Sequence, residues 1–335
     1  MKQLIVFIMV FAPSAALAGP LKVVTTTSDL ADITRQIAGD HAEVMHVCKG
    51  GQDPHFIQAK PSYMRAVADA DLFIRIGMDL EIAWESALLR GARNPRVQLG
   101  TPGHLDVSAV IPKLGVPTQT VDRSMGDVHA QGNPHYWLDP YNGRLIAKVI
   151  AERLGELVPA HRKHFAANLG RFLNDLDGRM FGGELVKRFG GDTLWQHELR
   201  GGLAAFLTAQ KAGDALGGWK KRGEALRGLP IIGFHTSWRY FAERFGVNIV
   251  AQLEPKPGIP PSPAHLLWVI QTAKAQKARL ILIEPYYDGR VADFVGGKTG
   301  VPVRVQSNAA GDGSDGYLGM LDALVVAVEG AGSGS

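Results

Sequence analysis

Short apolar runs alternate with helical segments in two separate blocks of this chain. The runs are rich in Val, Ile and Leu, and Gly, Pro, Asp or Ser residues bound them. Strands that alternate with helices favour βαβ units and a mainly parallel sheet, which is the α/β class. We therefore expect one sheet in each block, with strands at 21–27, 43–47, 72–76 and 96–99, then at 230–234, 248–251, 280–284 and 301–305.

A helical region separates the two blocks. Apolar residues recur at helical spacing after Pro140 and again after Pro159, which predicts either one long helix kinked near Pro159 or two helices in succession. The expected fold is two α/β lobes joined by one long connector helix. In domains, this is a signal peptide at 1–18, an N-terminal lobe at 19–140, the connector at 141–178, a C-terminal lobe at 179–329 and a flexible tail at 330–335. The segment 182–228 has no predicted role.

The start of the chain has the pattern of a secretory signal. Lys2 precedes an apolar run at 4–12, and Ala16 and Ala18 form a small-residue cleavage site. The run is too short to span a bilayer comfortably. A bacterial lipoprotein would need a cysteine where Pro20 stands. We therefore expect a protein secreted to the periplasm through its N-terminal signal peptide and not lipid-anchored.

Charge and cysteine content exclude several classes of site and partner. The net charge is only +4, and no basic stripe interleaves with aromatic residues, so nucleic acid is not expected as a partner. Cys48 is the one cysteine of the chain, which excludes an intramolecular disulfide and a cysteine-rich zinc site. We expect a monomer.

Three histidines follow stiff or strand-terminal segments. His55 and His135 each end an Asp-Pro-His or Asn-Pro-His triplet, in which proline restricts both its own backbone and that of the residue before it. His235 directly follows a predicted strand, where parallel sheets place ligand-binding groups. A single histidine is more often structural than a ligand. Three imidazoles with one oxygen donor, however, can form a tetrahedral zinc site.

These histidines stand within longer motifs that occur in order along the chain. The motifs lie at 53–55 with Pro61-Ser62 behind it, and at 133–140, 235–241, 254–258 and 284–285. Together they resemble the metal-binding solute receptors of bacterial ABC importers for zinc and manganese. This is the ZnuA/TroA-like group, the cluster A-I periplasmic binding proteins. The resemblance covers nearly the whole mature chain. It implies a metal held between the lobes by His55 and His135 from the first and by His235 and a fourth ligand from the second.

The chain departs from that family at two points. Family members often carry a carboxylate after the last strand, where this chain has Asn308. The fourth ligand could therefore be Asn308, Glu284, Asp312, Asp315 or water. Zinc receptors of the family often have a histidine-rich loop before the second ligand motif, whereas the loop at 118–132 offers only His129. Metal capture by that loop is therefore not expected.

Ligand chemistry favours zinc as the cargo. Three imidazoles suit Zn²⁺ better than Mn²⁺, which prefers carboxylates and water, although the affinity order also permits Cu²⁺ or Ni²⁺. We expect a receptor, not an enzyme, that delivers Zn²⁺ to the membrane ABC permease of a zinc importer, with a periplasmic metallochaperone as a second partner. The alternatives are a zinc-dependent hydrolase, a manganese receptor or an adhesin of the same fold. No His-Glu-x-x-His motif or nucleophile elbow supports the hydrolase.

Overall fold

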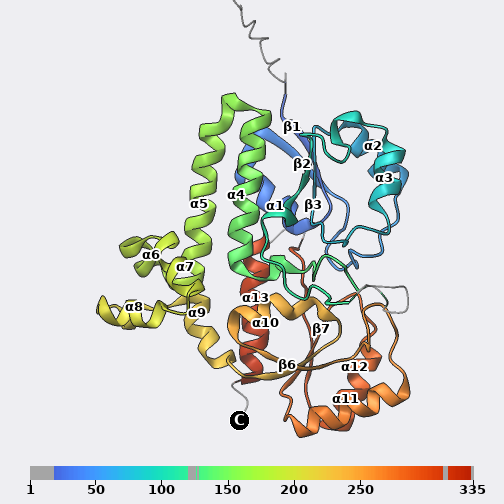
Figure 1. Cartoon of the computed structure of the whole chain (residues 1–335), viewed down its shortest axis with the longest axis vertical. Helices are drawn as coiled ribbons and strands as arrows, with labels where there is room; N and C mark the ends of the chain where they lie inside the picture. Colours follow the sequence, from blue (N-terminus) through green and yellow to red (C-terminus); the bar gives the residue numbers. More distant parts are fainter. Residues whose placement is uncertain (1–18, 120–125, 127, 312–315, 333–335) are drawn as a thin grey trace, which may run out of the picture.

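The computed structural model describes residues 19–119, 126, 128–311 and 316–332, so the expected signal peptide at 1–18 lies outside the described residues. Two four-stranded sheets lie one above the other in Figure 1, one in each lobe. Neighbouring strands are parallel in both sheets. The expected class, two α/β lobes with mainly parallel sheets, is confirmed.

In the first lobe the strand order is β2-β1-β3-β4. Side chains alternate between the two faces of this sheet, as the pleat of a strand requires. Val23 of β1 faces the core under α1, while its neighbour Val24 faces the core under α2 and α3. Both faces are therefore covered, which explains the continuous apolar runs. The strands are β1 (Leu21–Thr25), β2 (Ala42–His46), β3 (Leu72–Arg75) and β4 (His104–Asp106), and the helices are α1 (Ser28–Ala38), α2 (Pro61–Asp69) and α3 (Glu85–Ala92).

The expected strand at 96–99 is wrong. Pro95–Val97 forms a 3₁₀ turn in which the side chain of Asn94 accepts a hydrogen bond from the backbone N–H of Arg96. Gln98 turns back and donates to the carbonyl of Asn94 at 2.7 Å. These local polar contacts satisfy the backbone without a neighbouring strand. The fourth strand of the sheet is β4.

The second lobe repeats the same order, β6-β5-β7-β8. Ile231 of β5 faces a core with α10 and α13, and Ile232 faces a separate core with α11 and α12. The elements are β5 (Pro230–Gly233), α10 (Arg239–Phe245), β6 (Asn248–Gln252), α11 (Pro263–Ala275), β7 (Leu280–Ile283), α12 (Gly289–Thr299), β8 (Val303–Val305) and α13 (Gly316–Gly332). Residues 330–332 of the expected flexible tail are therefore helical, since α13 continues through them.

The region at 141–178 contains two helices and not one. α4 (Pro140–Leu157) ends before the 3₁₀ turn at Pro159–His161, and α5 (Arg162–Phe181) runs back beside it toward the second lobe (Figure 1). Proline removes a backbone donor and stops the first helix there. α4, α5 and α13 share one apolar core with a face of each sheet. The two lobes are thus packed on a common helical layer.

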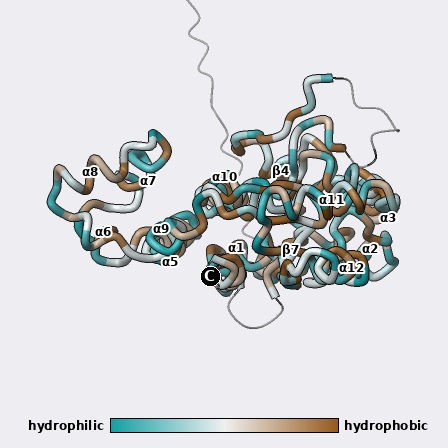
Figure 2. Tube along the Cα trace, turned by 90° about the horizontal axis from the view of Figure 1, so that it is seen from below, coloured by the Kyte–Doolittle hydropathy of each residue, from teal (hydrophilic) through white to brown (hydrophobic). Residues whose placement is uncertain are grey.

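Four short helices follow α5: α6 (Gly183–Phe189), α7 (Gly191–Leu199), α8 (Leu203–Ala209) and α9 (Gly218–Arg222). Figure 2 shows that α6, α7 and α8 extend sideways from the two lobes, and we call these three helices the lateral arm. Arg144 of α4 holds the arm by ion pairs to Asp177 of α5 and Asp192 of α7. The indole N–H of Trp195 donates to the same Asp177 at 2.7 Å.

Candidate metal centre

His55 lies in the loop that follows β2. The carboxylate of Asp53 accepts from the backbone N–H of His55 at 3.0 Å and lies 2.7 Å from its ring Nδ1. The indole of Trp84 holds the carbonyl of Pro54 at 2.9 Å. A single aspartate therefore fixes both the turn and the orientation of the imidazole.

His135, which follows β4 in the chain, is held by the same kind of contacts. The side-chain oxygen of Asn133 accepts from the backbone N–H of His135 at 2.9 Å and lies 3.1 Å from its Nδ1. His135 is fully buried, with Tyr136 and Trp137 buried beside it. Its Nε2 is buried and has no hydrogen-bond partner among the described residues.

His235 comes from the other lobe, directly after β5. Its Nδ1 lies 2.8 Å from the carboxylate of Glu254, which follows β6. Both residues are buried. The position follows the rule that parallel sheets bind ligands beyond the carboxyl ends of their strands.

The three imidazoles meet between the lobes. Each of His55, His135 and His235 offers one nitrogen, and these three atoms lie within 4.8 Å of one another. The ring centroids are separated by 5.2 Å or 5.3 Å in every pair. Each Nδ1 lies within hydrogen-bond distance of a side-chain oxygen, which leaves Nε2 as the metal-binding nitrogen of each ring, the usual arrangement for histidine ligands.

Burial keeps two of these rings neutral. The pKa of His135 lies well below its usual value, because the buried site disfavours the charged form and the other imidazoles add to this. Burial also lowers the pKa of His235, opposed by the hydrogen bond to Glu254. Neutral imidazole is the form that binds metal, so His135 and His235 are ready to bind without losing a proton.

The expected fourth ligands lie in different environments. The amide nitrogen of Asn308 donates to the hydroxyl of Tyr286 at 2.8 Å, and its backbone oxygen accepts from Trp137 at 2.7 Å. Glu284 is fully buried, and burial raises its pKa to about 8, so it holds a proton at neutral pH. Asp312 and Asp315 lie outside the described residues.

His129 is the residue that the sequence reasoning undervalued. Its Nε2 lies 3.2 Å from the Nε2 of His55, and the two rings are stacked with centroids 5.2 Å apart. Burial, together with the neighbouring imidazoles of His55 and His235, lowers its pKa to about 3. The one signal in the sequence that could have pointed to His129 is its position in the loop that leads directly into the Asn133-Pro134-His135 motif. The roles of Asp53, Asn133 and Glu254 as ring partners were also missed.

A cavity of about 280 Å³ opens beside the histidines. His55 and His129 line it together with Phe56, Asp79 and Ile82. Phe56 and Ile82 are 61% and 73% exposed, so two large apolar side chains reach solvent at this cavity.

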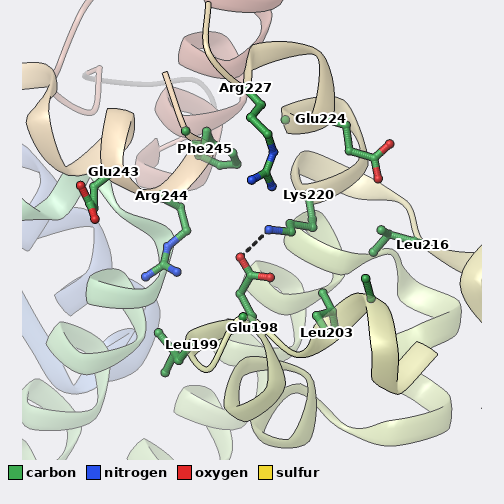
Figure 3. A pocket seen from close by; sticks show the side chains of 14 residues that line it. Glu198, Leu199, Leu203, Leu216, Lys220, Glu224, Arg227, Glu243, Arg244 and Phe245 are labelled. Atoms are coloured by element: carbon green, nitrogen blue, oxygen red, sulfur yellow. Dashed lines mark hydrogen bonds and ion pairs between the residues drawn. The ribbon is translucent and has the colours of Figure 1, made fainter. Parts of the chain in front are cut away.

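A larger cavity of about 480 Å³ lies between the lateral arm and α10, away from the three histidines. Figure 3 shows the ion pair between Lys220 and Glu198, 2.5 Å apart, with the side chains of Arg227 and Arg244 among those around it. Across the described part of the chain, the metal-ligating cluster is found at the histidines and not here.

Within the described ranges, no helix has the length and apolar character needed to cross a bilayer.

A family model described as "ZnuA: Zinc-uptake complex component A periplasmic" matches residues 23–179 and 209–331. The unmatched residues 180–208 include most of the lateral arm. A solved structure titled "Crystal structure of ZnuA" has a TM-score of 0.70 and 23% identity, and the alignment covers 94% of this chain and all of that one. At this level of identity, the likeness shows that the two chains share a fold.

Two curated relatives are named for manganese. The manganese ABC transporter substrate-binding lipoprotein PsaA of Streptococcus mitis is 32% identical over 166 residues, which is 49% of this chain and 50% of that protein. The manganese-binding lipoprotein MntA of Halalkalibacterium halodurans is 24% identical over 307 residues, 90% of this chain and 85% of that protein. The chain spans about half the length of the first curated relatives that it matches.

These relatives overturn the expected localisation. A protein free in the periplasm and not lipid-anchored was expected, whereas PsaA and MntA are named lipoproteins. The expectation depended on Pro20, which stands where a lipoprotein has its cysteine. The absence of a cysteine at this position does not exclude a lipid anchor. That expectation is wrong.

Proposed function

The chain belongs to the family of zinc-uptake components that this model describes, and on that premise we propose that it is the metal receptor of an ABC importer and that its cargo is Zn²⁺. The family consists of solute-binding receptors and not enzymes, which confirms the expected absence of enzymatic activity and disfavours the zinc-dependent hydrolase.

The observation that carries the proposal is the set of three buried imidazoles from two lobes. Their ligand atoms lie within 4.8 Å of one another, and each ring is oriented by an oxygen on its Nδ1. We assign His55, His135 and His235 as ligands. Nitrogen donors of this kind suit zinc, copper and nickel, whereas manganese prefers oxygen.

Manganese is the second candidate, because the curated relatives named above are manganese proteins. The carboxylates nearest to the three rings argue against it. Asp53 and Glu254 each face an Nδ1 and are therefore engaged with a histidine. The groups that manganese would prefer serve here to orient imidazoles, which supports zinc.

Delivery follows from the division of ligands between the lobes. His235 is the ligand contributed by the second lobe, so separation of the lobes removes one donor and weakens the site. We propose that the membrane ABC permease of a zinc importer promotes this separation, and that a periplasmic metallochaperone loads the receptor.

Calorimetric titration of the metal-stripped chain with Zn²⁺ and Mn²⁺ tests the choice of cargo. We expect one ion bound per chain and tighter binding of Zn²⁺. Tighter binding of Mn²⁺ would make the protein a manganese receptor, and binding of neither ion would remove the proposal altogether.

A further inference from the structure

The cavity of about 480 Å³ between the lateral arm and α10 has no part in the metal centre. Pockets that bind small molecules span roughly 300–1,000 Å³, so this one is large enough for a ligand. One of its walls includes Glu198, Leu199, Leu203 and Ala204. These residues belong to the segment 180–208, which the family model does not match. The cavity is therefore a feature of this chain's lateral arm and not of the family's metal site.

Two cationic side chains meet in this cavity. Figure 3 shows the guanidinium of Arg227 directed toward the ammonium of Lys220. An ammonium has three N–H donors, and Glu198 is the one partner found for Lys220 among the described residues. A guanidinium has five, and within the described part of the chain Arg227 has no hydrogen-bond or ion-pair partner. Both side chains thus keep donors that a ligand can use.

Two further carboxylates line the cavity, but neither neutralises Arg227. Glu224 pairs with Lys221 at 2.8 Å. Figure 3 shows Glu224 and Glu243 on opposite sides of the cavity, with their carboxylates directed away from Arg227. Like charges that face each other repel, and an anion between them removes that repulsion. The uncompensated charge inside the cavity is therefore positive, which favours an anionic ligand.

The rest of the lining is largely apolar or already paired. Leu203 and Phe245 are buried there, and Leu216 is half-buried. Arg244 forms another part of the wall, but its Nε and Nη2 donate to the two carboxylate oxygens of Asp139 at 2.7 and 2.8 Å. The fork of this guanidinium is therefore occupied. A ligand that fills the cavity needs an apolar body beside its charged group.

We propose that this cavity binds a small organic carboxylate, whose charged group lies between Arg227 and Lys220. The apolar body of the ligand lies against Leu203, Leu216 and Phe245. A guanidinium donates two parallel N–H groups to the two oxygens of a carboxylate, and an ammonium adds a third donor. The three histidines do not line this cavity, so the site does not depend on a bound metal.

Saturation-transfer NMR titrations of the whole protein with hexanoate test the site, since this method measures weak binding of small ligands. We expect hexanoate to bind on the order of 10–100-fold more tightly than acetate, because its additional CH₂ groups are buried against the apolar wall. Hexan-1-ol, which lacks the charge, should bind at least about tenfold more weakly than hexanoate. Binding of inorganic phosphate as tight as that of hexanoate would overturn the proposed class of ligand.

Arg227→Gln removes an exposed guanidinium and should weaken hexanoate binding by about tenfold or more. Ala204→Trp keeps every charge but places a large ring at the cavity wall, and it should abolish binding. Arg90→Gln is the matched control, because Arg90 is an exposed arginine of α3 outside the cavity, and it should change nothing. Failure of the wild type to bind hexanoate, or equal binding by Arg227→Gln and Arg90→Gln, would overturn the proposal.

Discussion

The two lobes place their histidines by different means, although their sheets have the same strand order. In the first lobe, His55 and His135 follow an aspartate or asparagine by two residues, and that side chain holds both the backbone and the ring. In the second lobe, the partner of His235 is Glu254, which lies 19 residues further along.

Glu254 reaches His235 only because β6 pairs with β5. The pairing continues past the strand ends, with Leu253 donating to the carbonyl of Gly233 and Glu254 to that of Phe234. The first lobe thus orients its ligands locally, and the second lobe orients its ligand through its sheet. The difference teaches that similar ring environments can arise from a short motif or from tertiary packing.

Removal of a ligand from either lobe should have the largest effect. His135→Ala and His235→Ala should each lower Zn²⁺ affinity by more than the roughly 10–100-fold cost of losing a ligand's hydrogen-bond partner. They should differ in one respect, because His235 is the ligand from the second lobe. In wild type and in His135→Ala, saturating zinc should slow amide hydrogen exchange around β5 and β6, and in His235→Ala it should not. Equal protection of these strands in both variants would contradict the division of ligands between lobes.

The ring partners should have an intermediate effect. Glu254→Ala should lower Zn²⁺ affinity by roughly 10–100-fold, since nothing local replaces the carboxylate. Asp53→Asn should have a much smaller effect, because Asn133 already holds His135 by the same two contacts that Asp53 makes to His55. Calorimetry on the two variants measures the contrast. If Asp53→Asn weakened binding as much as Glu254→Ala, the local motif would not be the source of orientation.

Each lobe also contains a buried carboxylic acid, Glu81 in the first and Glu284 in the second. Their replacement should have the smallest effect on zinc binding, and its effect should be seen in the pH dependence of stability. Burial raises the pKa of Glu284 from 4.5 to about 8 and that of Glu81 from 4.5 to about 7. A raised folded-state pKa means that the folded chain keeps a proton that the unfolded chain releases. Stability therefore falls as the pH rises, from 4.5 to about 8 for Glu284 and from 4.5 to about 7 for Glu81. The limiting slope is about 1.4 kcal/mol per pH unit for each group.

Glu284→Gln should remove this loss of stability between pH 7 and 8, whereas Glu81→Gln should not. Glu81 accepts from two backbone N–H groups, so its amide variant loses one acceptor and should be less stable by about 1–3 kcal/mol at every pH. Urea unfolding of the metal-stripped proteins at pH 7 and pH 8 measures both effects. A wild-type slope retained in Glu284→Gln would show that another group titrates in this window.

Sequence reasoning was accurate where periodicity and local chemistry agreed. Alternation of strands and helices predicted both sheets, since a parallel sheet buries both faces and requires continuous apolar strands. It failed at 96–99, where only Val97 of the run is fully buried and polar side chains satisfy the backbone locally. It also did not place His129 beside the other histidines, because nothing in its immediate sequence records that its loop returns to His55.

The sequence alone determined the two lobes, the proline-stiffened turns at His55 and His135, and the strand end that carries His235. Each depends on residues adjacent in the chain, whose backbone preferences act over short distances. Only the tertiary structure decided that the three rings meet, that Glu254 orients the third, and that His129 lies 3.2 Å from His55. These contacts join segments separated by 19 to 180 residues, as between His55 and His235, and the common core of α4, α5 and α13 sets them.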